Sequence, residues 1–462
     1  MSGLSRYPAS VVAALAIMLG TGAVSYTPPE DRSYPAPVPL RISGLIGNSS
    51  GNVVPIPPED AEGASYLPHS NVLRLPDGRL QYVPEDSETP ITVPPDDPGA
   101  MRSAAETRAW LESGDIPGST QTEKQISARS LLSLRLLTKP NGAALAAVND
   151  RWDYAWPRDA SWTASAFAAT GHHEESREIL EFLAAVQKED GTWEARYHAD
   201  GSPVLDGRAP QLDATGWFPW AVWLHAETSP GGAEEIESLW PSVKRAADSA
   251  SSSLGADGLP PGGADYWETP TLMPNLGTAA PLRTGLRAAA DLAQKLGHDE
   301  EAEHYRDAAS RLDDAIERDF APNGYTRTTW PMSGRDSAIT FLAPPFAPHD
   351  PGLSREIRRT EEILTAPNGG VVPGERWPQE PTVSWTPETA FFMLAAASSG
   401  DGREARRILG WLAARRTSLG AFPEKVDGGG EPKAAAPLAW TEAIVVLALA
   451  AEEGSLPVPP AP

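Results

Sequence analysis

The feature that most constrains this chain is a helical periodicity that starts near residue 120 and continues almost to the C-terminus. Apolar residues, many of them Ala and Leu, recur at i, i+3, i+4 and i+7 in twelve successive segments. Short loops with a Gly helix stop alternate with long loops. The pattern predicts an all-α fold of six helical hairpins, an (α/α)6 toroid, with its long loops on one face. The predicted helices are 122–137, 160–170, 173–188, 214–227, 234–254, 279–296, 300–319, 336–343 (the weakest), 353–365, 388–398, 402–415 and 438–451.

The chain before this helical region has a different composition, rich in Pro, Gly, Asp and Ser. One stretch alternates apolar and polar residues around Asp77-Gly78, a pair that is typical of a tight hairpin turn. We therefore expect residues 27–119 to form a short, irregular and partly β extension. The helical domain is expected to cover 120–453, and 454–462 to form a C-terminal tail.

The first 26 residues have the features of an export signal. Arg6 is the only charged side chain before Glu30, and Ala9–Val24 is apolar or small throughout. That stretch is short for a membrane-spanning helix, which needs about 20 residues. Residues 1–26 are therefore interpreted as a signal peptide or, as the less favoured reading, a membrane anchor that tethers the chain. A buried core helix is the remaining alternative, and the Pro-rich stretch that follows argues against it. The first two interpretations predict a secreted or membrane-anchored extracellular protein.

The balance of charged and special residues limits the partners of this chain. It has 38 Lys and Arg against 62 Asp and Glu, a net charge of −24, which repels phosphate backbones and excludes nucleic acid. Cys is absent, which removes disulfides and thiol catalysis, and the eight His show no metal-ligand spacing. We expect no metal and no cofactor. The 15 Trp outnumber the 9 Phe, which favours exposed aromatic platforms.

The long loop that runs into the second helix combines three aromatic residues with an Arg-Asp pair. The aromatic rings, Trp156 among them, are suited to wall a sugar pocket, and Arg158 and Asp159 to bind sugar hydroxyls. An Asp at a helix start is also a common cap, so a structural role stays open. The same two alternatives, ligand or cap, apply to Gln211 and Asp213 before the fourth helix.

Two later loops each carry a carboxylate on the same predicted face. Glu268 lies beside Trp267, and Glu424 follows an apolar loop segment. A carboxylic acid against an indole is partly desolvated, which raises its pKa towards a value suited to donating a proton. The alternative is an ordinary surface Glu. Two carboxylates at one pocket are what glycosidic-bond hydrolysis requires, because one protonates the leaving oxygen and the other activates water.

Three motifs in this order resemble glycoside hydrolase family 15, which comprises glucoamylases, glucodextranases and bacterial trehalases. They are WPRD at 156–159, WE at 267–268 and PEKV at 423–426, and the similarity extends over about residues 120–453. The resemblance implies an (α/α)6 barrel and an inverting, exo-acting hydrolase. Such an enzyme releases glucose from the non-reducing ends of α-glucosides or α-glucans. The implied partner is an oligo- or polysaccharide, and we expect a monomer.

The roles of the site residues follow from their positions in these motifs. Glu268 resembles the general acid of the family and Glu424 its general base. Arg158 and Asp159 resemble the pair that binds hydroxyls of the terminal glucose. The other substrate-binding positions are Arg376 in the family's RYP-type loop, Trp377 in place of the tyrosine of that loop, and Trp156, Trp193, Trp267 and Trp385.

Besides Trp377, the chain departs from the family pattern at two places. Thr269 stands where the family has a second Glu, which helps to hold the substrate on the leaving-group side. The large N-terminal β-sandwich of many bacterial members cannot fit in the residues before the helical region.

Two other functions are compatible with these residues. One is a catalytically impaired carbohydrate-binding protein of the cell envelope, which Thr269 favours and the two retained carboxylates disfavour. The other is a different (α/α)6 enzyme, such as a polysaccharide lyase or an unsaturated glucuronyl hydrolase. Those enzymes prefer acidic glycans, which the net charge of −24 disfavours.

Overall fold

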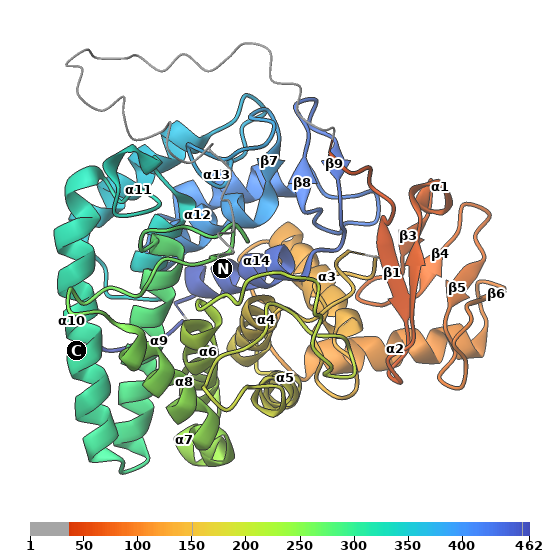
Figure 1. The fold of residues 1–462 in the computed structure, drawn as a ribbon. Coiled ribbons are helices and arrows are strands. Elements are labelled where there is room, and N and C mark those ends of the chain that lie inside the picture. Colours follow the sequence, from red (N-terminus) through yellow and green to blue (C-terminus); the bar gives the residue numbers. More distant parts are fainter. Residues whose placement is uncertain (1–36, 150, 455) are drawn as a thin grey trace, which may run out of the picture. The chain divides into compact units, whose positions relative to one another are not determined.

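A computed structural model describes residues 37–149, 151–454 and 456–462 of the chain (Figure 1). The predicted export segment, residues 1–26, lies outside the described residues, so its assignment stays a prediction. Among the residues that are described, no helix is both long enough and apolar enough to cross a membrane.

The predicted helices are present, and they form an inner and an outer ring. The inner ring consists of α4 (Pro157–Ala169), α6 (Ala214–Thr228), α9 (Leu276–Lys295), the 3-10 helix η4 (Ser337–Leu342), α12 (Thr386–Ser398) and α14 (Ala439–Glu452). The outer ring consists of α3 (Gln121–Leu137), α5 (His173–Ala185), α8 (Trp240–Ser253), α10 (Asp299–Asp319), α11 (Pro351–Leu364) and α13 (Gly402–Ala413). Each inner element contacts the next, and α14 returns to contact α4, which closes the ring (Figure 1). The predicted (α/α)6 toroid is therefore confirmed.

Two predicted helices differ in detail from the observed elements. The weak eighth segment is a single stretch of 3-10 helix, η4, which ends before the Pro344-Pro345 pair. The fifth is divided into α7 (Gly232–Glu235), the 3-10 turn η1 (Glu237–Leu239) and α8. Pro241, in the first turn of α8, has no N–H to continue a preceding helix, so the helix begins anew there. The remaining short turns are η2 (Ala321–Asn323) and η3 (Pro331–Ser333).

The inner helices are buried on every side, whereas the outer helices other than α3 bury one face. Nearly every residue of α6 and α14 is buried, and both segments are apolar all round. Helices α6 and α9 approach closely because both have a glycine at the crossing. A Cβ added to Gly216 would lie 2.1 Å from the Pro281 carbonyl oxygen, and one added to Gly285 would lie 2.5 Å from the Gly216 carbonyl oxygen.

An aromatic cluster fills the centre of the inner ring. Trp162 of α4 lies with its ring centroid 5.1 Å from that of Trp217 and 5.3 Å from that of Phe346. It also contacts Trp440 of α14, at 6.1 Å. The expectation that the abundant Trp residues form exposed platforms is therefore wrong for most of them, because nine of the 15 are buried, at 7% exposure or less. The fully buried ones are Trp162, Trp193, Trp217, Trp220 and Trp223.

The N-terminal part of the structure contains two small antiparallel sheets. The two-stranded sheet pairs β1 (Gly44–Gly47) with β2 (Val53–Ile56), and the short helix α1 (Pro58–Ala61) follows. The four-stranded sheet has the order β3 (Ser65–Tyr66), β4 (Leu73–Arg74), β5 (Leu80–Tyr82) and β6 (Ile91–Val93). The predicted turn at Asp77-Gly78 joins β4 to β5, with Gly78 at φ +87°.

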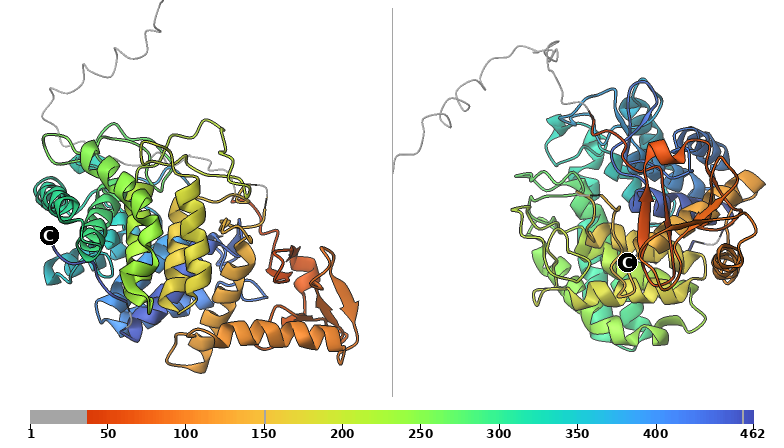
Figure 2. Two further views of the ribbon diagram at one scale, coloured as in Figure 1. Left: turned by 90° about the horizontal axis from the view of Figure 1, so that it is seen from below. Right: turned by 90° about the vertical axis from the view of Figure 1, so that its right-hand side faces the viewer.

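Helix α2 (Pro98–Glu112) was not expected from the sequence, so the extension is less irregular than predicted. The Asp97 side chain caps it by accepting a hydrogen bond from Ala100 N at 2.9 Å. Ala100, Ala104 and Leu111 on one face are buried. An Asp followed by Pro is a common helix start, so the signal was present in the sequence. The four-stranded sheet and α2 lie together beside the toroid (Figure 2).

A third sheet ties the N-terminal segment to the loops of the toroid. Its strands are β7 (Ser384–Trp385), β8 (Lys425–Val426) and β9 (Pro432–Lys433). Ala434 N donates a hydrogen bond to Val38 O at 2.8 Å. The first residues of the described chain therefore reach the long loops.

Candidate active site

A pocket of about 300 Å³ opens among the long loops that precede the inner helices. The N-cap residues of α4, α12 and α14, which are Trp156, Trp385 and Leu438, all line it. The N-termini of three inner helices therefore meet at the pocket, where their dipoles favour negative charge. Of the predicted site residues, all but Trp193 and Arg376 line this pocket.

Arg158 is held by residues from the next hairpin. Its Nη1 donates to Gln211 Oε1 at 2.6 Å and to Asp213 Oδ2 at 3.0 Å. Its guanidinium lies 4.7 Å from the ring centroid of Trp440. Asp213 precedes α6, but its side chain makes no capping hydrogen bond. Gln211 and Asp213 therefore fix the orientation of Arg158, a role that neither sequence alternative included.

Asp159 is a buried acceptor that faces the pocket. Helix α4 begins after Trp156 and has no side-chain cap, so Asp159 does not cap it. Its Oδ2 lies 3.5 Å from Arg158 Nε and has no hydrogen-bond partner among the described residues. Burial raises the pKa of Asp159 to about 6, although the charge of Arg158 lowers it. A buried oxygen without a partner is a favourable acceptor for a ligand hydroxyl.

Glu268 lies in a strained turn with a rigid support. Its φ of +56° is in the left-handed region, which costs about 1–2 kcal/mol for a residue other than glycine. Glu268 N donates to Asp265 O at 2.8 Å, and Arg327 Nη2 donates to Asp265 Oδ1 at 2.9 Å. The turn therefore holds the Glu268 side chain at the pocket, where 27% of it is exposed.

Both carboxylate oxygens of Glu268 have donors. Trp156 Nε1 donates to Oε1 at 2.7 Å, Gln211 Nε2 approaches the same oxygen at 3.4 Å, and Arg208 forms an ion pair with Oε2. Trp267 was predicted to desolvate the Glu268 carboxyl group and so to favour its protonated form. The donors from Trp156, Gln211 and Arg208 act in the opposite direction, because they stabilise the carboxylate form. For Glu268 to donate a proton, Arg208 has to leave it.

Glu424 is more enclosed, with 12% of its side chain exposed. Its backbone is fixed on both sides, because Thr386 N donates to Glu424 O at 3.0 Å and Glu424 N donates to Ala435 O at 2.8 Å. Burial raises the pKa of Glu424, while Lys425, with Nζ at 3.9 Å, and the Trp152 indole lower it. Oε2 has no hydrogen-bond partner within the described part of the chain.

Three indole rings form one wall of the pocket. Trp377 packs edge to face against Trp267 at 4.7 Å and against Trp385 at 5.1 Å between ring centroids. Arg327 stacks on the other side of Trp267, with its guanidinium carbon 3.8 Å from the ring centroid. Flat aromatic surfaces held in this way suit the apolar faces of sugar rings.

Two residues that were predicted to bind substrate, Trp193 and Arg376, lie outside the pocket, so this prediction is wrong for them. Trp193 is 1% exposed, packs against Phe218 and donates its indole N–H to Leu183 O at 2.9 Å, so it belongs to the core. The indole of Trp193 packs against a helix of the core. Its position in a loop of the sequence did not predict this burial. Arg376 is exposed and does not line the pocket, and its side chain lies next to Gly334.

Three further residues line the pocket that were not predicted from the sequence, namely Glu388, Arg208 and Lys425. A signal for Glu388 was present. At the start of α4, Trp156 is followed three residues later by Asp159, and at the start of α12, Trp385 is followed three residues later by Glu388. In both helices the Trp occupies the N-cap position and the acidic residue the third helical position. The repeated pattern places two carboxyl groups at equivalent positions of the ring.

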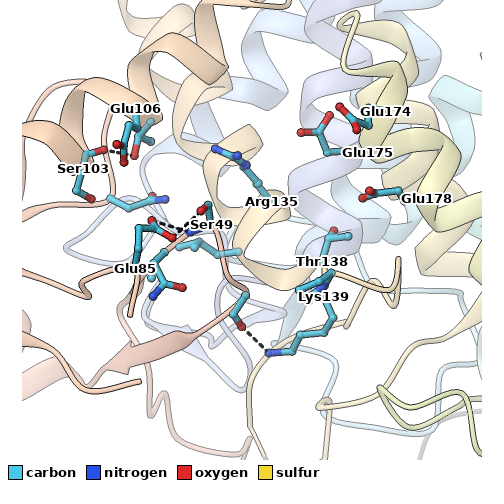
Figure 3. Close-up of a pocket in the computed structure, with 17 residues that line it drawn as sticks. Ser49, Glu85, Ser103, Glu106, Arg135, Thr138, Lys139, Glu174, Glu175 and Glu178 are labelled. Carbon is cyan, nitrogen blue, oxygen red and sulfur yellow. Dashed lines mark hydrogen bonds between the residues drawn. The ribbon is translucent and has the colours of Figure 1, made fainter. Parts of the chain in front are cut away.

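A second pocket, of about 420 Å³, lies between the N-terminal strands and helices α3 and α5 (Figure 3). It contains Arg135 and Lys139 surrounded by carboxylates and hydroxyls, and none of its lining residues is aromatic. It therefore has no surface on which a sugar ring could stack. Its acidic residues are Glu85, Glu106, Glu174, Glu175 and Glu178.

No group of three or more His, Cys, Asp or Glu with a metal-binding arrangement occurs among the described residues.

Solved structures share this fold. A glycosidase matches with a TM-score of 0.63 and 20% identity, over 74% of this chain and 100% of that chain. A bacterial glucoamylase complexed with acarbose matches with a TM-score of 0.63 and 18% identity, over 79% of this chain and 63% of that chain. A glucoamylase from Saccharomycopsis fibuligera matches with a TM-score of 0.59 and 12% identity, over 74% and 97%. The fold is thus that of the (α/α)6 glycosidases.

The comparison of sequences is more specific. Residues 121–340 match the model of glycosyl hydrolases family 15, which confirms the resemblance inferred from the motifs. An uncharacterized glycosyl hydrolase of Methanocaldococcus jannaschii is 30% identical over 125 residues. That match covers 27% of this chain and 20% of the relative. Family and fold together support a glycoside hydrolase.

Proposed function

We propose that this protein is an exo-acting, inverting glycoside hydrolase that releases glucose from the non-reducing ends of α-glucosides or α-glucans. The observation that carries the proposal is the presence of Glu268 and Glu424 in one pocket, together with indole walls and the Arg158–Asp159 pair. In this mechanism Glu268 protonates the glycosidic oxygen. Glu424 removes a proton from a water molecule, whose oxygen attacks the anomeric carbon from the opposite side.

The surroundings of the two carboxylates support this division of roles. Glu268 is the more exposed, as expected of an acid that faces the departing group. Glu424 is enclosed, and Lys425 lies close enough to stabilise its carboxylate form, which a general base requires.

The closed inner end of the pocket supports exo action. Trp440 and Tyr266 line the pocket and pack on Phe391 of the central aromatic cluster, at 5.1 Å and 6.1 Å between ring centroids. A pocket that ends on a solid aromatic cluster accepts the end of a saccharide chain, whereas an endo-acting enzyme needs a groove that is open at both ends.

Glucose release from maltose, isomaltose, trehalose and starch tests the activity and identifies the linkage. NMR of fresh product should show β-glucose first. Glu268→Gln and Glu424→Gln should each lower turnover by about 10²–10⁴-fold. Glu268→Gln should lose less on an aryl α-glucoside whose leaving group needs little protonation, whereas Glu424→Gln should gain no relief. Initial α-glucose, or full activity in either variant, would exclude this mechanism.

A carbohydrate-binding protein without activity is the second candidate, and the Arg208–Glu268 ion pair favours it. A carboxylate held by an arginine has no proton to donate. Calorimetric binding of maltose by the full chain, with no glucose released from any substrate of the panel, would select this candidate.

We further propose that the protein acts outside the cytoplasm. The support is the uncharged apolar stretch Ala9–Val24 that follows Arg6. Cell fractionation with a C-terminal tag tests it, and a purely cytoplasmic protein that retains Met1 would contradict it.

A further inference from the structure

Glu388 is a buried carboxyl group of the pocket to which the mechanism above gives no role. It is the third residue of α12, is 4% exposed and lines the pocket. Its Oε2 has no hydrogen-bond partner, and no ion pair reaches it from any described residue. A buried carboxyl oxygen that faces an open pocket without a partner is available to a ligand.

The backbone places Glu388 next to Glu424. Strand β7, which leads into α12, pairs with β8 so that Trp385 lies opposite Lys425. Thr386 N, at the start of α12, donates to Glu424 O at 3.0 Å. The two carboxyl groups therefore belong to one rigid wall and cannot separate unless the sheet breaks.

The charges around this wall decide which carboxyl group keeps a proton. Glu388 faces the negative groups Glu424 and Asp336 and the positive group Arg158, and Arg158 is already shared by Asp213 and Asp159. Glu424 has its own cation in Lys425.

Ionising both Glu388 and Glu424 would place two neighbouring negative charges in a desolvated site, which is strongly unfavourable. The proton therefore stays on Glu388. Consistently, burial raises the pKa of Glu388 to about 8, and the charges of Glu424 and Asp336 raise it further. The backbone amide of Glu388 and the charge of Arg158 lower this pKa, but they do not outweigh the burial.

We propose that Glu388 is a substrate-binding residue that stays protonated at neutral pH and donates a hydrogen bond to a hydroxyl oxygen of the bound sugar. The proposal deepens the proposed function and rests on it. The wall then presents one neutral donor, Glu388, beside one anionic base, Glu424. Asp159, which also lines the pocket, supplies the complementary acceptor. A sugar hydroxyl can both donate and accept, so it matches this pair of groups.

The donor exists only while Glu388 is protonated. Its ionisation removes the hydrogen bond and adds a negative charge beside Glu424. Sugar binding should therefore weaken in alkaline solution through Glu388, independently of the proton that Glu268 has to supply for hydrolysis.

The test is calorimetric binding of glucose and maltose to the full chain between pH 6 and pH 9. Wild-type affinity should change little between pH 7, where Asp159 is already ionised, and about pH 8, and should then fall by up to tenfold per pH unit. Glu388→Gln keeps a neutral donor of similar shape, so the alkaline weakening should disappear. Glu388→Ala should weaken binding about 3–10-fold at pH 7, the loss of one hydrogen bond.

Glu442→Gln is the matched control. Glu442 is a fully buried carboxyl group on α14 that does not line the pocket. This variant should keep the alkaline weakening of the wild-type protein. If Glu388→Gln also keeps it, or if Glu388→Ala binds glucose as the wild type does, the proposal is wrong.

A second readout does not depend on binding. The infrared difference between wild type and Glu388→Gln at pH 6 should contain the C=O band of a protonated carboxylic acid, and its absence would overturn the proposal. If the wild type binds neither sugar, the proposed function fails, whereas the infrared band still decides the protonation of Glu388. Failure of the two proposals is therefore distinguishable.

Discussion

Single residues of the pocket differ mainly in which partners their carboxyl oxygens have. Both oxygens of Glu268 have donors, whereas Asp159 Oδ2 and Glu424 Oε2 have no hydrogen-bond partner in the described structure. Unpartnered buried acceptors are costly unless a ligand or water satisfies them. Under the proposed function, they indicate where the hydroxyls of a bound saccharide would gain hydrogen bonds.

Replacing Asp159 separates a binding role from a structural one. Asp159→Ala removes the acceptor and should lower kcat/KM by about 10–100-fold, as expected for a hydrogen bond to a charged group. Because Asp159 does not cap α4, the melting temperature should change little. Steady-state kinetics and thermal unfolding of the same preparation test this. A lowered melting temperature with unchanged specific activity would instead show that the residue supports the helix.

Replacing Arg208 tests whether it holds Glu268 in the carboxylate form. Without the neighbouring cation the protonated acid is favoured, so the alkaline limb of kcat/KM on maltose should move up by roughly one pH unit in Arg208→Ala. Arg151→Ala is the control, since Arg151 also lines the pocket but forms no ion pair with Glu268. An identical pH profile in all three proteins would show that Arg208 does not govern the protonation of the acid.

At the scale of helices, the backbones of α6 and α9 approach closely where the two helices cross at Gly216 and Gly285. Gly216→Ala would place a methyl group against the Pro281 carbonyl and should destabilise the fold by about 1–3 kcal/mol. Because Gln211 and Asp213 precede α6 and hold Arg158, activity should also fall. Urea unfolding together with kinetics measures both effects.

The control for this variant is a glycine with free space around it. Gly410 lies in the interior of α13, and a Cβ added there meets nothing within 4 Å. Gly410→Ala should therefore stabilise the protein by about 0.5–1 kcal/mol through helix propensity. Similar destabilisation in both variants would show that the crossing is not the cause.

The helices could be predicted because each one has an apolar periodicity of its own, and the alternation of loop lengths then indicates the toroid. Glu268, Glu424 and Asp159 could be found because local motifs carry them. Trp193 could not be placed, because a loop Trp packs either in the core or at a pocket according to distant residues, here Phe218. The network Gln211–Arg158–Asp213 depends on the packing of two hairpins, which no local pattern encodes.

At the scale of the whole molecule, several buried carboxyl groups outside the catalytic pair make stability depend on pH. Burial raises the pKa of Glu442, Asp336 and Glu361 to about 7 in each case. Between pH 5 and 7 the folded protein holds protons that the unfolded chain has lost. Their stabilising contribution is complete below the pKa of the unfolded chain, 4.5 for the two Glu and 3.8 for Asp336, and is lost as the pH rises through about 7.

Glu442→Gln isolates one of these groups. A rise in the pKa of Glu442 from 4.5 to about 7 corresponds to a loss of at most about 3 kcal/mol in the free energy of unfolding when the group ionises. Gln cannot ionise, so the melting temperature of the variant relative to that of the wild type should increase from pH 5 to pH 8. The exposed Glu300→Gln is the control and should show a constant difference. A constant difference in Glu442→Gln as well would show that Glu442 titrates normally.

The aromatic cluster at the centre of the ring has a kinetic consequence under the proposed function. Because the pocket ends on Trp440 and Tyr266, released glucose has only the entrance through which the substrate came. The shortened chain must leave before the product can follow, and a new chain cannot bind until both have gone. Each cut is then a separate encounter, so the enzyme works distributively along a polymer, and accumulated glucose competes directly with the next chain end.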